Sequence, residues 1–185
     1  MHGLRSIALA PAALALAAGA AAALAASSYP DPVGDVKGGA GPDIAAVSVS
    51  HTARTVTFRV RFAKAPPLGA SARQRWVDML LIGIDVPPRG PLPTRRDWQG
   101  VDYAVGLHGG QRTALLVRAP GWTTVARVPV AVQGRTLSVS VGRRTIGSPA
   151  AFDFVVSAGR ELADGAGGGS DSAPPRGVFH YRLAG

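Results

Sequence analysis

The chain of 185 residues contains no cysteine. This absence excludes a disulfide framework, thiol catalysis and a lipid-modified cysteine after a leader peptide. A domain without disulfides must rest on its hydrophobic core, or on a core supplemented by a bound metal ion. Long apolar runs are also absent after residue 25, so no later segment is expected to span a membrane.

Residue patterns that carry catalysis are scarce. Glu161 is the only glutamate, so a glycosidase-like pair of carboxylates would have to use aspartates. His51, His108 and His180 lack the HxH or HExxH spacing of a transition-metal site. No G-x-S-x-G motif marks a serine nucleophile. The sequence therefore predicts a protein that is not an enzyme, with an exported hydrolase as the least favoured of three hypotheses.

Lysine is rare, whereas arginine is abundant. Lys37 and Lys64 are the only lysines among 20 basic residues, and the net charge is +9. Removing a leader that holds Arg5 and no acidic residue would leave +8, which is +9 minus 1. Two interpretations stay open: the arginines reflect the codon bias of a GC-rich genome and form a solvated surface, or they bind an anionic polymer. Basic residues never run longer than two and do not alternate with aromatics, so nucleic acid is not expected as a partner.

Residues 1–25 resemble a secretory signal peptide. One positive charge precedes an uncharged Ala/Leu run, and Ala23-Leu24-Ala25 has the small-x-small pattern of a cleavage site. An uncleaved membrane anchor is the alternative, but alanine makes the run weakly apolar, and Pro11 and Gly19 interrupt it. We expect cleavage after Ala25, a secreted or cell-surface protein, and no stable membrane insertion afterwards.

The remaining sequence predicts β-strands. Residues 26–42 are rich in Pro, Gly and Asp and are expected to form an N-terminal arm, ahead of a sandwich domain over 43–185. Thr55–Phe62 alternates strictly, with Val56, Phe58, Val60 and Phe62 on one face. Trp76–Asp85 is almost continuously apolar, which predicts a central strand, although a short buried helix fits almost as well.

Further strands are expected at 44–50, 101–107, 112–118, 122–132, 136–141, 152–158 and 177–183. Residues 87–100 are expected to form a long polar loop, and the Gly/Ser-rich stretch 160–176 to be mobile. About nine short strands without a convincing helix predict an all-β fold, an Ig-like or jelly-roll β-sandwich.

Three aspartates gather in the arm. Asp31, Asp35 and Asp43 lie within thirteen residues, among glycines whose carbonyls are free to turn inward. Ca²⁺ takes several carboxylate and carbonyl oxygens, so these residues are candidate ligands of a structural calcium ion, the one cofactor that the sequence suggests. Their spacing is not that of an EF-hand loop, and ordinary turn chemistry is the alternative.

Aromatic residues give the candidate ligand site. Sugars stack on exposed aromatic faces, and Trp98, Tyr103 and Trp122 fall in or beside loops. Trp76 begins an apolar strand and is expected in the core. Asp85, Asp97 and Asp102 stand at or near strand ends, where a carboxylate serves either a functional site or a hydrogen bond to loop amides.

Several short motifs resemble one group of exported proteins. Asp31-Pro-Val-Gly-Asp35, Pro42-Asp43-Ile44-Ala-Ala-Val47 and the Thr55–Phe62 strand are similar to the opening of secreted DOMON-like, family-9 carbohydrate-binding-like β-sandwiches, including many uncharacterised actinobacterial ones. Ile82-Gly-Ile-Asp85, Gly100-Val-Asp102-Tyr103, Gly121-Trp122 and Pro175-Arg-Gly177-Val-Phe179 extend the resemblance to roughly residues 29–183.

The resemblance implies an Ig-like sandwich that binds sugar, haem or structural calcium, or has no known ligand. Asp85-Val86-Pro87 lacks the second acid of many relatives, and no His/Met pair stands where haem would be ligated. The leading hypothesis is a secreted, non-catalytic, carbohydrate-binding-like module stabilised by calcium, with a glycan as partner. The second hypothesis is an envelope module whose basic surface binds anionic cell-wall polymer.

Overall fold

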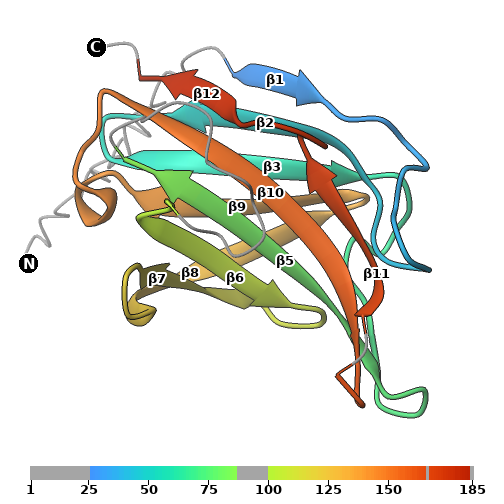
Figure 1. The fold of residues 1–185 in the computed structure, drawn as a ribbon. Coiled ribbons are helices and arrows are strands. Elements are labelled where there is room, and N and C mark those ends of the chain that lie inside the picture. Colours follow the sequence, from blue (N-terminus) through green and yellow to red (C-terminus); the bar gives the residue numbers. More distant parts are fainter. Residues whose placement is uncertain (1–25, 87–99, 166, 184–185) are drawn as a thin grey trace, which may run out of the picture.

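The computed structural model describes residues 26–86, 100–165 and 167–183. The expected signal peptide, Asp97, Trp98 and almost all of the expected polar loop lie outside these ranges. Within them, the chain forms antiparallel strands and one short 3-10 helix (Figure 1). Among the described residues, no helix has the length and apolar character needed to cross a bilayer.

The strands are β1 (Ser27–Pro30), β2 (Ile44–His51), β3 (Thr55–Phe62), β4 (Ala70–Ser71), β5 (Trp76–Asp85), β6 (Tyr103–His108), β7 (Thr113–Arg118), β8 (Thr123–Gln133), β9 (Thr136–Gly142), β10 (Ala151–Leu162), β11 (Gly167–Ala173) and β12 (Phe179–Arg182), and the helix is η2 (Arg144–Ile146). The predicted all-β class is confirmed, and a strand forms in each of the nine predicted places. The alternation of Thr55–Phe62 has the predicted faces, because its four apolar side chains are buried. Trp76–Asp85 is a strand and not a helix.

One curled antiparallel sheet folds over into two layers. Its strand order is β1-β2-β3-β9-β8-β7-β6-β5-β10-β11, with β4 on β5 and β12 on β10. We call β1, β2, β3 and β9 sheet A, and β4, β5, β6, β7, β10, β11 and β12 sheet B. Strand β8 belongs to both, because its first part pairs with β7 and its last four residues pair with β9. The two layers are therefore continuous on the β8 side.

The core fills the space between the layers. Phe58 of β3 meets Phe152 and Phe154 of β10, with ring centroids 5.9 and 5.5 Å apart. All three side chains are fully buried, beside Val60 of β3 and Ile82 of β5. Burying such side chains is the main source of stability in a domain without disulfides.

The opposite side of the sandwich is an open seam between β2 and β11, which the N-terminal arm closes. Lys37 of the arm exchanges two backbone hydrogen bonds of 2.8 Å with Ser170 of β11. The Tyr29 hydroxyl of β1 donates to the carbonyl of His180 in β12 over 2.7 Å. In Figure 1 β1 runs beside β12 along this edge. The arm is therefore part of the sandwich, and its first residues pair with β2 as β1.

The expectation that 160–176 is mobile is wrong. Strand β10 continues to Leu162, and Gly167–Ala173 pairs with it as β11. The inward positions of β11 are Gly169, Asp171 and Ala173, all buried. Because these residues are small or acidic, they do not produce the apolar alternation by which a half-buried strand is recognised.

Candidate metal site

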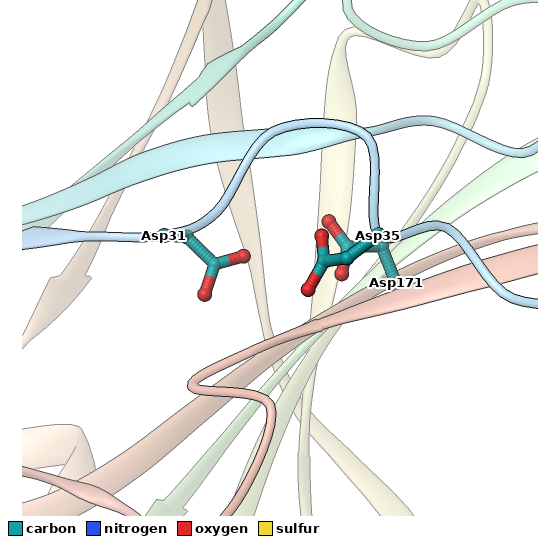
Figure 2. A group of neighbouring side chains, drawn as sticks. All are labelled: Asp31, Asp35 and Asp171. Carbon is teal, nitrogen blue, oxygen red and sulfur yellow. The ribbon is translucent and has the colours of Figure 1, made fainter.

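Three aspartates meet in the seam. Asp31 follows β1, Asp35 lies in the arm, and Asp171 is on β11. One carboxylate oxygen from each lies within 4.8 Å of one from each of the others. Figure 2 shows the three carboxylates turned toward one another between the arm and β11. The fold thus gathers three carboxyl groups, two from the arm and one from β11, which the sequence separates widely.

Asp31 is the most isolated of these side chains. It is 7% exposed, and neither of its carboxylate oxygens has a hydrogen-bond partner. Asp35 and Asp43 each have a buried Oδ1 that also lacks a hydrogen-bond partner. A buried carboxylate without a compensating partner is costly, because it has lost its hydration. These four oxygens are therefore acceptors that lack a donor or a cation.

The acid–base properties of the cluster reflect this burial. The pKa of Asp31 is raised from 3.8 to about 7, chiefly by the loss of solvent and in addition by the negative charges of Asp171, Asp35 and Asp43. The pKa of Asp171 is also raised, chiefly by burial, although hydrogen bonds from the backbone amides of Ile44 and Ser172 oppose the shift. The folded protein thus holds Asp31 and Asp171 in a place that disfavours their ionised form.

Hydrogen bonds fix two of the acids to the arm and the strand edges. Asp171 accepts from the amide of Ile44 through Oδ2 over 2.7 Å, and from the amide of Ser172 through Oδ1 over 2.6 Å. Asp43 Oδ2 accepts from the amide of Gly34 over 2.9 Å. These bonds anchor the arm at both ends of the turn that carries Asp35.

Glycines let the arm lie directly on β11. A Cβ at Gly41 would stand 2.4 Å from the carbonyl oxygen of Gly169, and a Cβ at Gly39 would stand 2.6 Å from that of Gly168. Real Cβ atoms do not come this close to another backbone. The contact therefore requires glycine, and it holds the acidic turn over Asp171.

The oxygens present suit a calcium ion. Ca²⁺ binds oxygens at about 2.3–2.6 Å, so two ligands on opposite sides of one ion are roughly 5 Å apart at most. The separations within 4.8 Å fit this limit. The donors are carboxylate oxygens, which hard cations prefer, and Asp31 and Asp35 have oxygens without another partner. A divalent cation would also balance the negative charge that raises the pKa of Asp31.

Two members of this cluster are among the candidate ligands that the sequence predicts, and the third is not. Asp31 and Asp35 lie together as expected, whereas Asp43 stands beside them, close enough to raise the pKa of Asp31, and supports the turn through Gly34. Asp171 lies in the Gly/Ser-rich stretch that the sequence predicts to be mobile, so it is not among the predicted ligands. The one sequence feature that could have pointed to Asp171 as a candidate is that it is the only acidic residue between Gly167 and Ala173.

The predicted aromatic site is separate from this cluster. Trp98 lies outside the described residues. Tyr103 is half-buried against the core, with the Arg118 guanidinium 5.5 Å from its ring centroid. Trp122 is 50% exposed in the β7–β8 turn, where its φ of 50° is unusual for a residue with a side chain. Strands β5 and β10 separate β6, which carries Tyr103, from β11, which carries Asp171, so the aromatics lie apart from the aspartate cluster.

The other singled-out residues have structural contacts. Asp85 is fully buried at the end of β5. Asp102 Oδ2 accepts from the amide of Val86 over 2.8 Å, so it ties the chain down where β5 ends. Trp76 is half-buried, with the Arg160 guanidinium 3.7 Å from its ring centroid, and Arg160 in turn pairs with Asp78 over 2.7 Å. These contacts account for Asp102 and Trp76 without a ligand.

No protein-family model matches this chain, and a search of curated proteins finds no match either.

Proposed function

We propose that this protein is a secreted, non-catalytic β-sandwich module of carbohydrate-binding-like type, in which a bound Ca²⁺ ion joins the two sheets. The observation that carries the proposal is Asp31, whose buried carboxylate has no hydrogen-bond partner and faces Asp35 and Asp171. A cation supplies the positive charge that this group of acids lacks.

The position of the cluster indicates a structural role for the ion, namely to hold the two sheets together. The sandwich is continuous at β8 and open between β2 and β11, and the aspartates lie at the open side. An ion held by Asp31 and Asp35 of the arm and Asp171 of β11 would tie the arm, and with it β1 and β2, to sheet B. Such an ion binds the folded state and not the unfolded chain, so it stabilises the fold by mass action.

The ligand surface of the proposed module is the end of sheet B around Trp122. The exposed indole offers an apolar face of the kind that stacks on a pyranose ring, and Thr123 and Thr124 follow it with exposed hydroxyl-bearing side chains. A loop residue held in a strained backbone conformation is a common feature of binding sites. These features support a glycan as the partner, in line with the sequence resemblance.

Calorimetric titration of the chelator-treated protein with CaCl₂, and with MgCl₂ for comparison, tests the ion. We expect one Ca²⁺ per chain and a melting temperature that rises with calcium. Asp31→Asn should weaken calcium binding at least about tenfold, whereas Asp164→Asn, in an exposed turn, should leave it unchanged. If neither calcium nor chelator changed the melting temperature, the aspartates would serve only as hydrogen-bond acceptors for turn amides, and the calcium proposal would fail.

Glycan-array binding tests the ligand surface. The wild-type protein and Trp122→Ala are compared in calcium, because the Trp122 side chain is 50% exposed and its removal should cost little stability. We expect binding to a defined glycan set that Trp122→Ala loses while its melting temperature stays the same. Equal binding by both proteins, or none by either, would contradict the carbohydrate assignment while leaving the calcium site standing.

A further inference from the structure

The outer face of sheet A carries arginine and hydroxyl side chains. The valines and phenylalanines of β2, β3 and β9 point into the core, so the residues between them point outward. We call these outward residues the hydroxyl–arginine face: Ser48, Thr57, Arg59, Arg61, Thr136, Ser138 and Ser140. Ser48, Arg59 and Ser138 stand in register across the three strands, so small hydroxyls flank the arginine on both sides. On these three strands, arginine is the only long side chain that points outward.

Charge is segregated between the two sheets. Strands β2, β3, β8 and β9 contain no aspartate or glutamate. The acids of the described residues lie instead in the arm, in β5, β10 and β11, and in turns beside sheet B. Further arginines stand at the ends of the hydroxyl–arginine face: Arg54, Arg135, Arg143 and Arg144. Sheet A is therefore the positively charged side of the molecule.

The two central guanidinium groups keep most of their donors free for a ligand. Arg59 Nη1 donates to Ser50 Oγ over 2.9 Å, and Arg61 Nη2 donates to the carbonyl of Ala45 over 3.4 Å. Neither forms an ion pair with a carboxylate of the described residues. A guanidinium has five N–H donors in a planar fork that matches phosphate oxygens, so each arginine can bind an anion in addition to its neutral acceptor.

The side chains of the hydroxyl–arginine face favour some anionic partners over others. It has no aromatic side chain on which a nucleic-acid base could stack, and no large apolar side chain to enter a bilayer. Its hydroxyls can bond to the hydroxyls of a polyol or sugar. Arg59 and Arg61 are two residues apart on one strand, about 7 Å. A glycerol phosphate unit contains as many backbone bonds as two peptide residues, so consecutive phosphates of an extended polymer match this spacing.

We propose that the hydroxyl–arginine face binds a linear phosphodiester polymer of the glycerol phosphate type, lying across sheet A with adjacent phosphates on Arg59 and Arg61. This binding is independent of the calcium cluster and of Trp122, because it uses the outer surface of sheet A and neither the seam nor the β7–β8 turn.

The test measures the affinity of the purified protein for lipid-free poly(glycerol phosphate) at several salt concentrations. Arg59→Gln/Arg61→Gln is compared with Arg112→Gln/Arg127→Gln, which removes the same charge from exposed positions at sheet B. We expect the first variant to bind at least about tenfold more weakly, with a salt dependence lower by about one to two counterions. The control variant should stay within about twofold of the wild-type protein.

Comparison probes decide whether recognition is specific. Poly(U) and vesicles of phosphatidylglycerol and phosphatidylcholine supply phosphodiesters in other settings, and both should bind more weakly than poly(glycerol phosphate). Melting temperatures equal to that of the wild-type protein show that both variants fold. Equal losses in the two double variants, no binding by the wild-type protein, or tighter binding to poly(U) or vesicles would each overturn the proposal.

Discussion

The backbone amide of Ile44, the first residue of β2, donates a hydrogen bond of 2.7 Å to Oδ2 of Asp171 in the middle of β11. The two residues are 127 positions apart, and their bond joins the edges of the two sheets. The same Asp171 carboxylate belongs to the group of acids with Asp31 and Asp35. One side chain therefore both links the sheets directly and contributes to the proposed calcium site.

Removing Asp171 should have two separable effects. Asp171→Asn keeps an acceptor for the Ile44 amide but removes one ligand charge, so calcium affinity should fall at least about tenfold. Asp171→Ala also leaves the buried Ile44 amide without an acceptor, which should cost a further 1–3 kcal/mol or so even in chelator. Calorimetry and urea denaturation measure the two effects. The assignment fails if both variants bind calcium as the wild-type protein does.

The stability of the calcium-free protein should fall as the pH rises. The pKa of Asp31 is about 7 in the folded state and 3.8 ordinarily, so between these values the folded protein holds a proton that the unfolded chain has released. The stabilising contribution is complete below the lower value and is lost as the pH rises through the folded pKa. In chelator, Asp31→Asn should remove this loss and melt higher than the wild-type protein near pH 8.

Calcium should reverse this pH dependence. The ion binds the ionised carboxylate, so protons compete with it below the folded pKa of Asp31. The rise in melting temperature on adding calcium should therefore be larger near pH 8 than near pH 5.5. Thermal denaturation in calcium and in chelator across this range provides the measurement, and a calcium effect that does not change with pH would argue against Asp31 as a ligand.

The glycine contact between the arm and β11 should be sensitive to a single methyl group. Gly41→Ala places a Cβ 2.4 Å from the Gly169 carbonyl oxygen, so the arm must move away from β11. We expect a loss of about 1–3 kcal/mol in the free energy of unfolding, together with weaker calcium binding. Gly167→Ala is the matched control, because nothing lies within 4 Å of its new Cβ. If both variants unfold at the same urea concentration, the contact does not hold the arm.

Phe58 and Arg59 are neighbours with opposite roles in the fold. Phe58 is fully buried among the aromatic rings of β10, so Phe58→Ala should cost about 3–5 kcal/mol of unfolding free energy. Arg59 is exposed, so Arg59→Ala should cost less than about 0.5 kcal/mol. Chemical denaturation of the two variants gives both values, and similar losses would contradict the assignment of faces in β3.

Much of the fold followed from local patterns. Alternation of apolar residues predicted the inward face of β3, and alternation, a continuous apolar run at Trp76–Asp85 and turn signals together predicted the place of nine strands. The last strand illustrates the same rule, since Tyr181 and Leu183 are buried while His180 and Arg182 are exposed. The turn glycines and prolines then predicted where these strands end.

Strand β11 and the full set of acids could not be predicted in this way. Gly167–Ala173 has no apolar alternation, because its inward residues are Gly169, Asp171 and Ala173, and Gly169 must be small where it faces the arm at close range. Nor did proximity in the sequence identify the acids that meet: Asp43 is nearer to Asp35 along the chain, but Asp171 completes the group.

The sequence by itself determined the all-β class, the lack of disulfides, the arginine-rich charge and the acidic arm, because these depend on composition and on patterns within a few residues. Only the tertiary structure decided that Asp171 joins Asp31 and Asp35, that the arm seals the seam, and that acids are excluded from sheet A. Those features depend on which strand edges meet when the sheet folds over, and pairing between distant segments is set by the packing of the whole core.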